Sequence, residues 1–218
     1  DQIIKFGNKA NEQLFDAIKA QVSDASNAAT EEEWDKLVEA IFVDDNVSHA
    51  LSKAVLKRFI YHVKRKLFSE PVTNHLMPIL FGGQGAGKTY FVANFTSPLN
   101  HLTAHSNLKE VTDSRNVGIF KKYIMSIDEM GKAGQADIET VKTAITRDQL
   151  TYRMMGTNSE NTVDQNAIFI GTSNKTIGEV ITDTTGNRRF MQLDMATNGQ
   201  PQCDVVNSTD FIRLWFSV

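Results

Sequence analysis

Residues 82–89 read Gly-Gly-Gln-Gly-Ala-Gly-Lys-Thr and satisfy the pattern G-x-x-x-x-G-K-[ST]. Glycines let the backbone curl so that successive N–H groups converge on phosphate oxygens, and a following helix adds its positive N-terminus. The apolar run 76–81 precedes the motif and the helix-like segment 90–94 follows it, which favours a strand–loop–helix unit over a plain glycine-rich turn. Lys88 is then expected to bridge the β- and γ-phosphates of a nucleotide, and the Thr89 hydroxyl to ligate Mg²⁺. The predicted nucleotide-contacting residues are Gly83, Gln84, Gly85, Ala86, Gly87, Lys88, Thr89 and Tyr90.

A second motif places two carboxylates, Asp128 and Glu129, directly after the apolar run 123–127. The carboxyl end of a strand is where α/β sheets position ligand groups. We expect Asp128 to hold Mg²⁺ through water and Glu129 to polarise the attacking water. Such an acid favours hydrolysis over phosphoryl transfer to a bound acceptor. An apolar run followed by Asp-Glu is common in isolation, but here it follows Lys88 within the same predicted sheet.

Two further polar elements follow along the chain. Asn174 comes shortly after the apolar run 167–170 and could orient the lytic water, although an Asn turn after a strand is the simpler interpretation of that residue alone. Arg188 and Arg189 are adjacent after a turn-like segment, and one of them could be an arginine finger that neutralises charge on the γ-phosphate. A finger donated to a neighbour's nucleotide requires an oligomer. A surface ion pair is an equally good explanation for one of the two arginines.

Apolar strand-like runs alternating with helix-like segments predict an α/β fold with a mostly parallel sheet covered by helices on both faces. Residues 1–72 are expected to form a small helical subdomain, because Thr30 and Glu33 have the spacing of a capping box and a second helix ends before Pro71. Residues 73–195 form the predicted core. Residues 196–218 are expected to pack on that core.

The composition is that of an ordinary globular protein, with 41% hydrophobic and 22% charged residues and a net charge of −3. A chain with a net negative charge is not a polycation of the kind that coats nucleic acid. A ring could still hold a few basic residues in its pore. Charge is unevenly spread, with acids between residues 24 and 45 and bases between 46 and 69. We interpret these as solvated helix faces, in preference to a subunit or DNA contact. The single cysteine, and the lack of an apolar run of membrane length, lead us to expect a cytoplasmic protein. The first residue, Asp1, suggests a fragment.

The order of these motifs within about one hundred residues resembles the virulence-associated protein E family, superfamily-three-like helicase domains of phages, plasmids and genomic islands. The resemblance covers residues 76–195 and includes the helix-like segment 141–146. It implies an AAA+-like P-loop NTPase fold that uses ATP and Mg²⁺, assembles as a homo-oligomeric ring of hexameric size, and translocates on DNA. Domains of this family are often fused to primases. The expected location is the cytoplasm of a bacterial cell or phage-infected host.

The resemblance also implies a hairpin over residues 150–165 that grips single-stranded DNA in the ring pore, with Arg153, Thr157 and Asn158 as candidate contacts. This sequence departs from the family there. The hairpin tip has no Lys or Arg, and Met154 and Met155 replace the usual aromatic, so they fit a core better than a base-stacking role.

Three functions remain open from the sequence. The first is an ATP-dependent DNA helicase or translocase for replication of a mobile genetic element, with Lys88, Glu129, Asn174, Arg188 and Arg189 as catalytic residues. The second is an ATP-dependent DNA-binding or assembly switch without unwinding, favoured by the poorly charged hairpin. The third is a small-molecule kinase, which shares the P-loop but needs an acceptor site that the sequence does not indicate.

Overall fold

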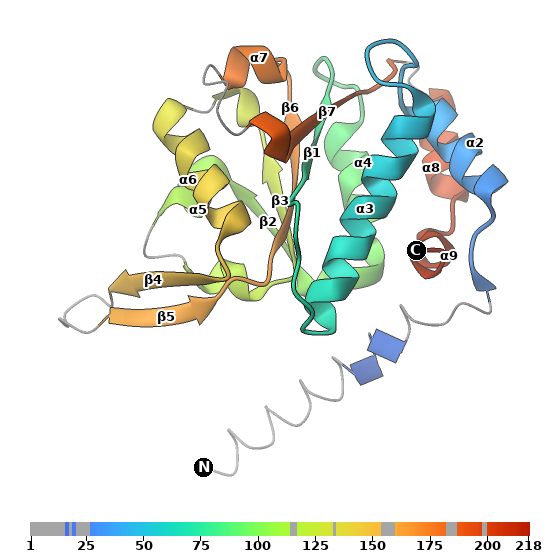
Figure 1. Cartoon of the computed structure of the whole chain (residues 1–218). Coiled ribbons are helices and arrows are strands. Elements are labelled where there is room, and N and C mark those ends of the chain that lie inside the picture. The colour runs from blue at the N-terminus through green and yellow to red at the C-terminus, as the bar shows by residue number, and fades with distance from the viewer. Residues whose placement is uncertain are drawn as a thin grey trace.

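The computed structural model describes residues 16–17, 19–20, 27–113, 117–132, 134–153, 160–181, 187–197 and 200–218. Its centre is a five-stranded sheet in which each pair of neighbouring strands runs parallel (Figure 1). The strands are β1 (Met77–Phe81), β2 (Thr103–Asn107), β3 (Ile124–Asp128), β6 (Ile168–Ser173) and β7 (Phe190–Asp194), in the order β2-β3-β6-β1-β7. The predicted α/β fold with a mostly parallel sheet is confirmed.

The register of the sheet determines which loops meet. Leu80 lies opposite Thr172 between β1 and β6, and Ile127 lies opposite Gly171 between β3 and β6. The carboxyl ends of these three central strands therefore share one edge of the sheet. Whatever follows each of them along the chain is brought together there.

Two layers of helices cover the sheet, one on each face (Figure 1). Successive strand residues point to opposite faces, so Leu80 packs in one core and Ile79 in the other. The first face carries α2 (Glu31–Ile41), α3 (His49–Leu67), α4 (Lys88–Phe95), α8 (Gln200–Ser208) and α9 (Phe211–Phe216). The second face carries α5 (Leu108–Thr112), α6 (Gln135–Thr146) and α7 (Ile177–Val180). Within the described ranges, no helix has both the length and the apolar character needed to cross a bilayer.

The opposite charges of α2 and α3 meet within the chain. Lys53 Nζ lies 3.1 Å from Glu31 and 2.6 Å from Asp35, and Lys57 also pairs with Glu31. The uneven charge of this region is thus partly matched between two adjacent helices. The predicted capping box is confirmed, because Glu33 N–H donates to Thr30 Oγ1 and Thr30 N–H donates to Glu33 Oε2.

The chain ends on the first face of the sheet. Trp215 in α9 is fully buried and its Nε1 donates to Phe95 O at 2.8 Å. Trp34 Nε1 in α2 donates to Ser217 Oγ at 2.7 Å. Helices from both ends of the sequence thus contribute to one core with α4. The division of the chain at residues 72 and 195 stays a prediction.

A two-stranded antiparallel hairpin, β4 (Gln149–Arg153) and β5 (Glu160–Asp164), extends from the body of the protein (Figure 1). The predicted hairpin is confirmed. Arg153 lies at the end of β4, opposite Glu160. Thr157 and Asn158, the other two candidate DNA contacts, lie outside the described residues. Short 3-10 helices in the described part of the chain include η2 (Ser97–Leu102), η3 (Val117–Lys121), η4 (Met130–Lys132) and η5 (Asn187–Arg189).

Candidate functional site

The glycine-rich segment forms a loop between β1 and α4, as the motif predicts. Gly85 and Gly87 have φ angles of 83° and 77°, in the left-handed region that favours glycine. A Cβ built at either residue would meet no atom within 4 Å, so space is open in front of the loop. A backbone curled around open space at the start of a helix is the form of an anion-binding cradle.

Lys88, the first residue of α4, extends back over this loop. Its Nζ donates to Gly82 O and Gly83 O, each at 2.7 Å. An ammonium group has three N–H donors, so one remains for a ligand beyond the two carbonyls. Burial lowers the pKa of Lys88, and the Asp128 carboxylate acts in the opposite direction.

Asp128 joins two strands and a helix at the edge of the sheet. Its Oδ1 accepts hydrogen bonds from Thr89 Oγ1 at 3.2 Å and from Thr172 Oγ1 at 2.9 Å. The pairing of β3 with β6 sets Asp128 beside Thr172, while Thr89 comes from the first turn of α4. A hydroxyl and a carboxylate in contact are oxygen ligands of the type that Mg²⁺ prefers. The residues at this point therefore fit the predicted metal.

Glu129 follows β3 with a strained backbone. Its φ angle is 56°, in the left-handed region that costs a non-glycine residue about 1 kcal/mol. Its N–H donates to Thr172 Oγ1 at 3.2 Å, and its carboxylate pairs with Lys132. Strain of this kind concentrates at functional sites, where the surroundings hold the residue in place.

Asn174 lies against a glycine in the turn after Glu129. A Cβ at Gly131 would come within 2.3 Å of Asn174 Oδ1, which leaves no room for any other residue type at position 131 unless Asn174 moves. A Cβ at Gly171 would similarly lie 2.5 Å from Met130 Sδ. Two glycines therefore let the segment after β3 and the end of β6 approach each other closely.

These residues surround one cavity of about 550 Å³. Of the predicted catalytic residues, Lys88, Glu129 and Asn174 line it, and so does Thr89. The remaining lining residues are Gln84, Gly85, Ala86, Gly87, Tyr90, Lys132, Thr172 and Ser173. Gly83 contributes its carbonyl to Lys88, and Asp128 reaches the cavity wall through its bonds with Thr89 and Thr172.

Thr172, Ser173 and Lys132 were not among the residues predicted from the sequence. Thr172 lies two residues before Asn174, and only the pairing of β6 with β3 sets it beside Asp128. Lys132 reaches Glu129 because η4 turns the chain back within three residues. The sequence carries no signal for that contact.

Arg188 and Arg189 lie away from this cavity. Both belong to η5, which precedes β7, and the first residue of β7 pairs with Met77 at the start of β1. The glycine-rich loop follows the other end of β1, so about four strand residues, or roughly 13 Å, separate the two sites. The structure does not bring these arginines to the glycine-rich loop of their own chain.

The sheet order, together with a glycine-rich loop between β1 and α4 and two acids at the end of β3, defines an α/β protein with a P-loop-like fold. The chain belongs to the family of the virulence-associated protein E-like domain, which matches residues 25–215. The family predicted from the order of motifs is therefore confirmed.

Solved structures share the fold. Two apo structures of the C-terminal region of NrS-1 have TM-scores of 0.61 and 0.62 with this chain at 18% identity, and cover 87% and 88% of it. A third has a TM-score of 0.60 at 19% identity and covers 88%. The chain spans 46% to 47% of the length of those structures. No curated protein matches this chain.

Proposed function

We propose that this domain binds ATP and Mg²⁺ in the cavity at the glycine-rich loop and hydrolyses the ATP to drive a DNA helicase or translocase. Membership of the virulence-associated protein E-like family supports a role in replication of a mobile genetic element. One observation carries the proposal: Lys88, Thr89, Glu129 and Asn174 line a single cavity. These residues come from three separate parts of the sheet edge.

In this proposal the loop amides and Lys88 hold the β- and γ-phosphates. Thr89 and Asp128 would hold the metal, with Asp128 acting through water. When bound, Mg²⁺ supplies positive charge to the phosphate oxygens. The hydroxyl of Thr172 supports this arrangement by donating to Asp128 while it accepts from Glu129 N–H.

Glu129 then serves as the general base that takes a proton from the attacking water, and Asn174 orients that water. The Glu129 carboxylate pairs with Lys132, and both residues line the cavity. A base aimed at water favours hydrolysis over transfer to an organic acceptor. This argues against the small-molecule kinase.

Arg188 or Arg189 supplies the arginine finger in this proposal. Because they lie at the far end of β1 from the loop of their own chain, the finger would act on the nucleotide of a neighbouring subunit. The active form is then a homo-oligomer, for which we propose a hexameric ring. Single-stranded DNA would pass through its pore along the hairpin, with Arg153, Thr157 and Asn158 as contacts.

The test compares ATP turnover, with and without single-stranded DNA, in the wild type and the Glu129→Gln variant. We expect turnover that DNA stimulates and that the variant loses by at least about a hundredfold. Glu32→Gln removes an exposed carboxylate on α2 and should leave turnover unchanged. Light scattering with a non-hydrolysable nucleotide should show a closed oligomer. If the protein is strictly monomeric and single-stranded DNA does not change its rate of ATP turnover, the helicase proposal is contradicted.

A DNA-binding or assembly switch is the second candidate. The observation that favours it is the sequence of the hairpin tip, which contains no Lys or Arg over residues 154–159, so phosphate contacts there are few. This candidate predicts DNA binding and slow hydrolysis with no strand separation. A strand-displacement assay on the full-length protein distinguishes the two candidates.

A further inference from the structure

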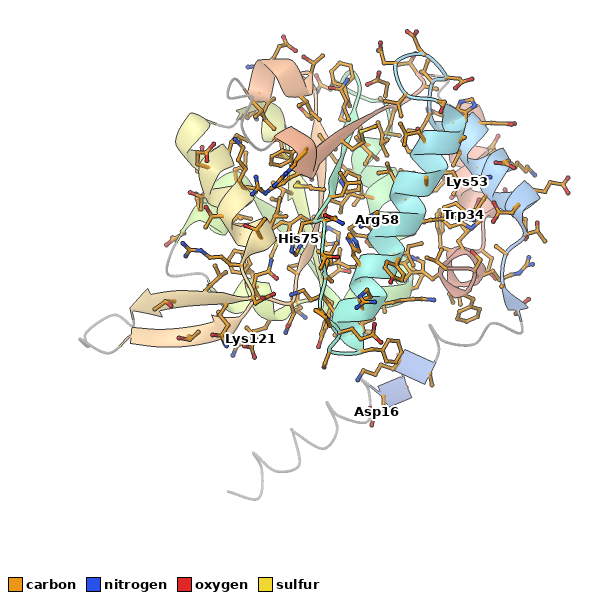
Figure 2. All side chains as sticks on the ribbon, in the orientation of Figure 1. Asp16, Trp34, Lys53, Arg58, His75 and Lys121 are labelled. Carbon is orange, nitrogen blue, oxygen red and sulfur yellow. The ribbon has the colours of Figure 1, made fainter. Side chains whose placement is uncertain are left out.

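A second cavity of about 550 Å³ lies apart from the nucleotide site. We call it the arginine cavity, because Arg58, Arg188 and Arg189 line it with His75, Asn74 and Thr146. Arg58 comes from α3, and Arg188 and Arg189 come from η5. Asn74 and His75 lie in the connection between α3 and β1, and Thr146 is the last residue of α6. Figure 2 shows Arg58 and His75 beside each other where α3 faces β1.

Positive charge in the arginine cavity is poorly compensated. No Asp or Glu lines it, and within the described part of the chain none of its three guanidinium groups forms an ion pair. Arg58 makes one long hydrogen bond, 3.5 Å from Nη2 to Thr73 O. Three arginines held together without an acid are unfavourable unless an anion joins them.

The pKa values of two histidines, His62 and His75, are lowered by burial and by nearby positive charges. Burial is the largest cause that lowers the pKa of His62 to about 4, and the charges of Arg58, His75 and Arg65 contribute to the same decrease. Burial also lowers the pKa of His75, with contributions from Lys66 and Arg189, while Asp148 acts in the opposite direction. Cations therefore outweigh acids around this cavity, and an anionic group entering it would meet a favourable potential.

The chemistry of the arginine cavity selects for phosphate. Guanidinium groups present planar pairs of N–H donors that match phosphate oxygens, and they stay charged at every physiological pH. Asn74 and Thr146 add neutral side chains that can hydrogen-bond to the same oxygens. The cavity is also large enough for more than a single carboxylate.

We propose that the arginine cavity is a phosphate-binding site, that Arg58 is a third phosphate-contacting residue beside Arg188 and Arg189, and that the occupant is the terminal phosphate of a nucleotide held by a second copy of this chain. The identity of the occupant rests on the proposed function. The chain's own nucleotide is excluded because its loop follows the opposite end of β1. A head-to-tail assembly joins two different surfaces of each copy, and so can bring this cavity to the next copy's glycine-rich loop.

The phosphate site itself is tested without ATP hydrolysis. Tripolyphosphate binding is measured by titration calorimetry in the Lys88→Ala background, which removes the lysine of the other candidate phosphate site. We expect binding that a further Arg58→Ala change weakens by at least about tenfold. Arg58→Lys, which keeps the charge and loses the planar fork, should fall between. Lys57→Ala is the matched control, because Lys57 is the neighbouring base on α3 and pairs with Glu31 on α2. Absence of binding, or equal loss in the Lys57 control, would overturn the site.

The occupant is tested by mixing inactive variants. Arg58→Ala and Lys88→Ala, each inactive alone, should recover part of the ATP turnover when mixed, since some interfaces then pair an intact loop with an intact arginine cavity. A merely structural role for Arg58 gives no recovery and overturns the proposed occupant. Weaker binding of oligothymidylate by Arg58→Ala, with tripolyphosphate binding unchanged, would instead assign the arginine cavity to a nucleic-acid backbone. A wild type without ATP turnover would contradict the proposed function and leave the calorimetric result standing.

Discussion

Thr89 Oγ1 donates a hydrogen bond to Asp128 Oδ1 across 3.2 Å, although the two residues are 39 positions apart in the chain. The bond joins the first turn of α4 to the end of β3. It sets a hydroxyl and a carboxylate side by side at the wall of the cavity at the glycine-rich loop.

Thr172 is expected to position Asp128 and Glu129 without contacting the reacting atoms. Thr172→Val removes the hydroxyl that donates to Asp128 Oδ1 and accepts from Glu129 N–H. Loss of one to two such bonds should lower kcat about tenfold, with little change in KM. Steady-state ATP hydrolysis measures both. Thr112→Val, which removes a hydroxyl bonded to Leu108 O, is the control, and an equal effect in both variants would refute the role.

Gly131 is expected to be required for the position of Asn174. In Gly131→Ala the new Cβ would lie 2.3 Å from Asn174 Oδ1, so Asn174 must move out of its place in the cavity. We expect ATP turnover to fall by at least about tenfold, because small misplacements of catalytic groups are costly. At exposed Gly118 a Cβ would meet nothing within 4 Å, so Gly118→Ala should be neutral. Full activity in Gly131→Ala would show that Asn174 is dispensable.

The backbone at Glu129 should reverse the usual ranking of alanine and glycine. At its φ of 56° alanine carries the strain of the left-handed region and glycine does not. Glu129→Gly should therefore have a free energy of unfolding about 1 kcal/mol higher than Glu129→Ala. Urea denaturation of the two variants gives the difference. A more stable alanine variant would mean that the left-handed turn is absent in solution.

The buried His62 predicts a loss of stability in acid. Its pKa is lowered to about 4 in the folded protein, against about 6.5 in an unfolded chain. Between these values the unfolded state binds the extra proton, so the free energy of unfolding falls as the pH falls from about 6.5 to 4. His62→Leu should remove about 2 kcal/mol of the decrease between pH 7 and pH 4.5. Urea denaturation at both pH values gives the free energy of unfolding of each protein. An equal decrease between pH 7 and pH 4.5 in the wild type and in His62→Leu would contradict the prediction.

Local patterns in the sequence were enough to predict much of the fold. The runs that became β1, β3 and β6 are apolar because these strands are buried on both faces. Strand β2 was missed because it is an edge strand with only Thr103 buried among its five residues. Strand β7 was also missed, since Phe190–Asp194 has only two buried positions and shows no apolar run.

Local patterns were also enough for part of the candidate site. Residues 82–89 and Asp128-Glu129 are contiguous, so their chemistry can be recognised from spacing alone. Thr172 acquires its role from the pairing of β6 with β3, and Lys132 from the turn of η4. Arg58 lies about 130 residues from Arg188 in the sequence, and only the packing of α3 beside the start of β1 puts them around one cavity. Such contacts depend on tertiary structure, which spacing does not encode.

The cavity at the glycine-rich loop is proposed to hold a magnesium nucleotide, and equilibrium binding measures whether it does. Calorimetry with Mg²⁺ and a non-hydrolysable ATP analogue should show one site per chain in the wild type. Lys88→Ala should bind at least about a hundredfold more weakly, and Lys109→Ala, an exposed base on α5, should bind as the wild type does. A wild type that binds no nucleotide, or a Lys88→Ala variant that binds it equally well, would mean that this cavity is not a nucleotide site.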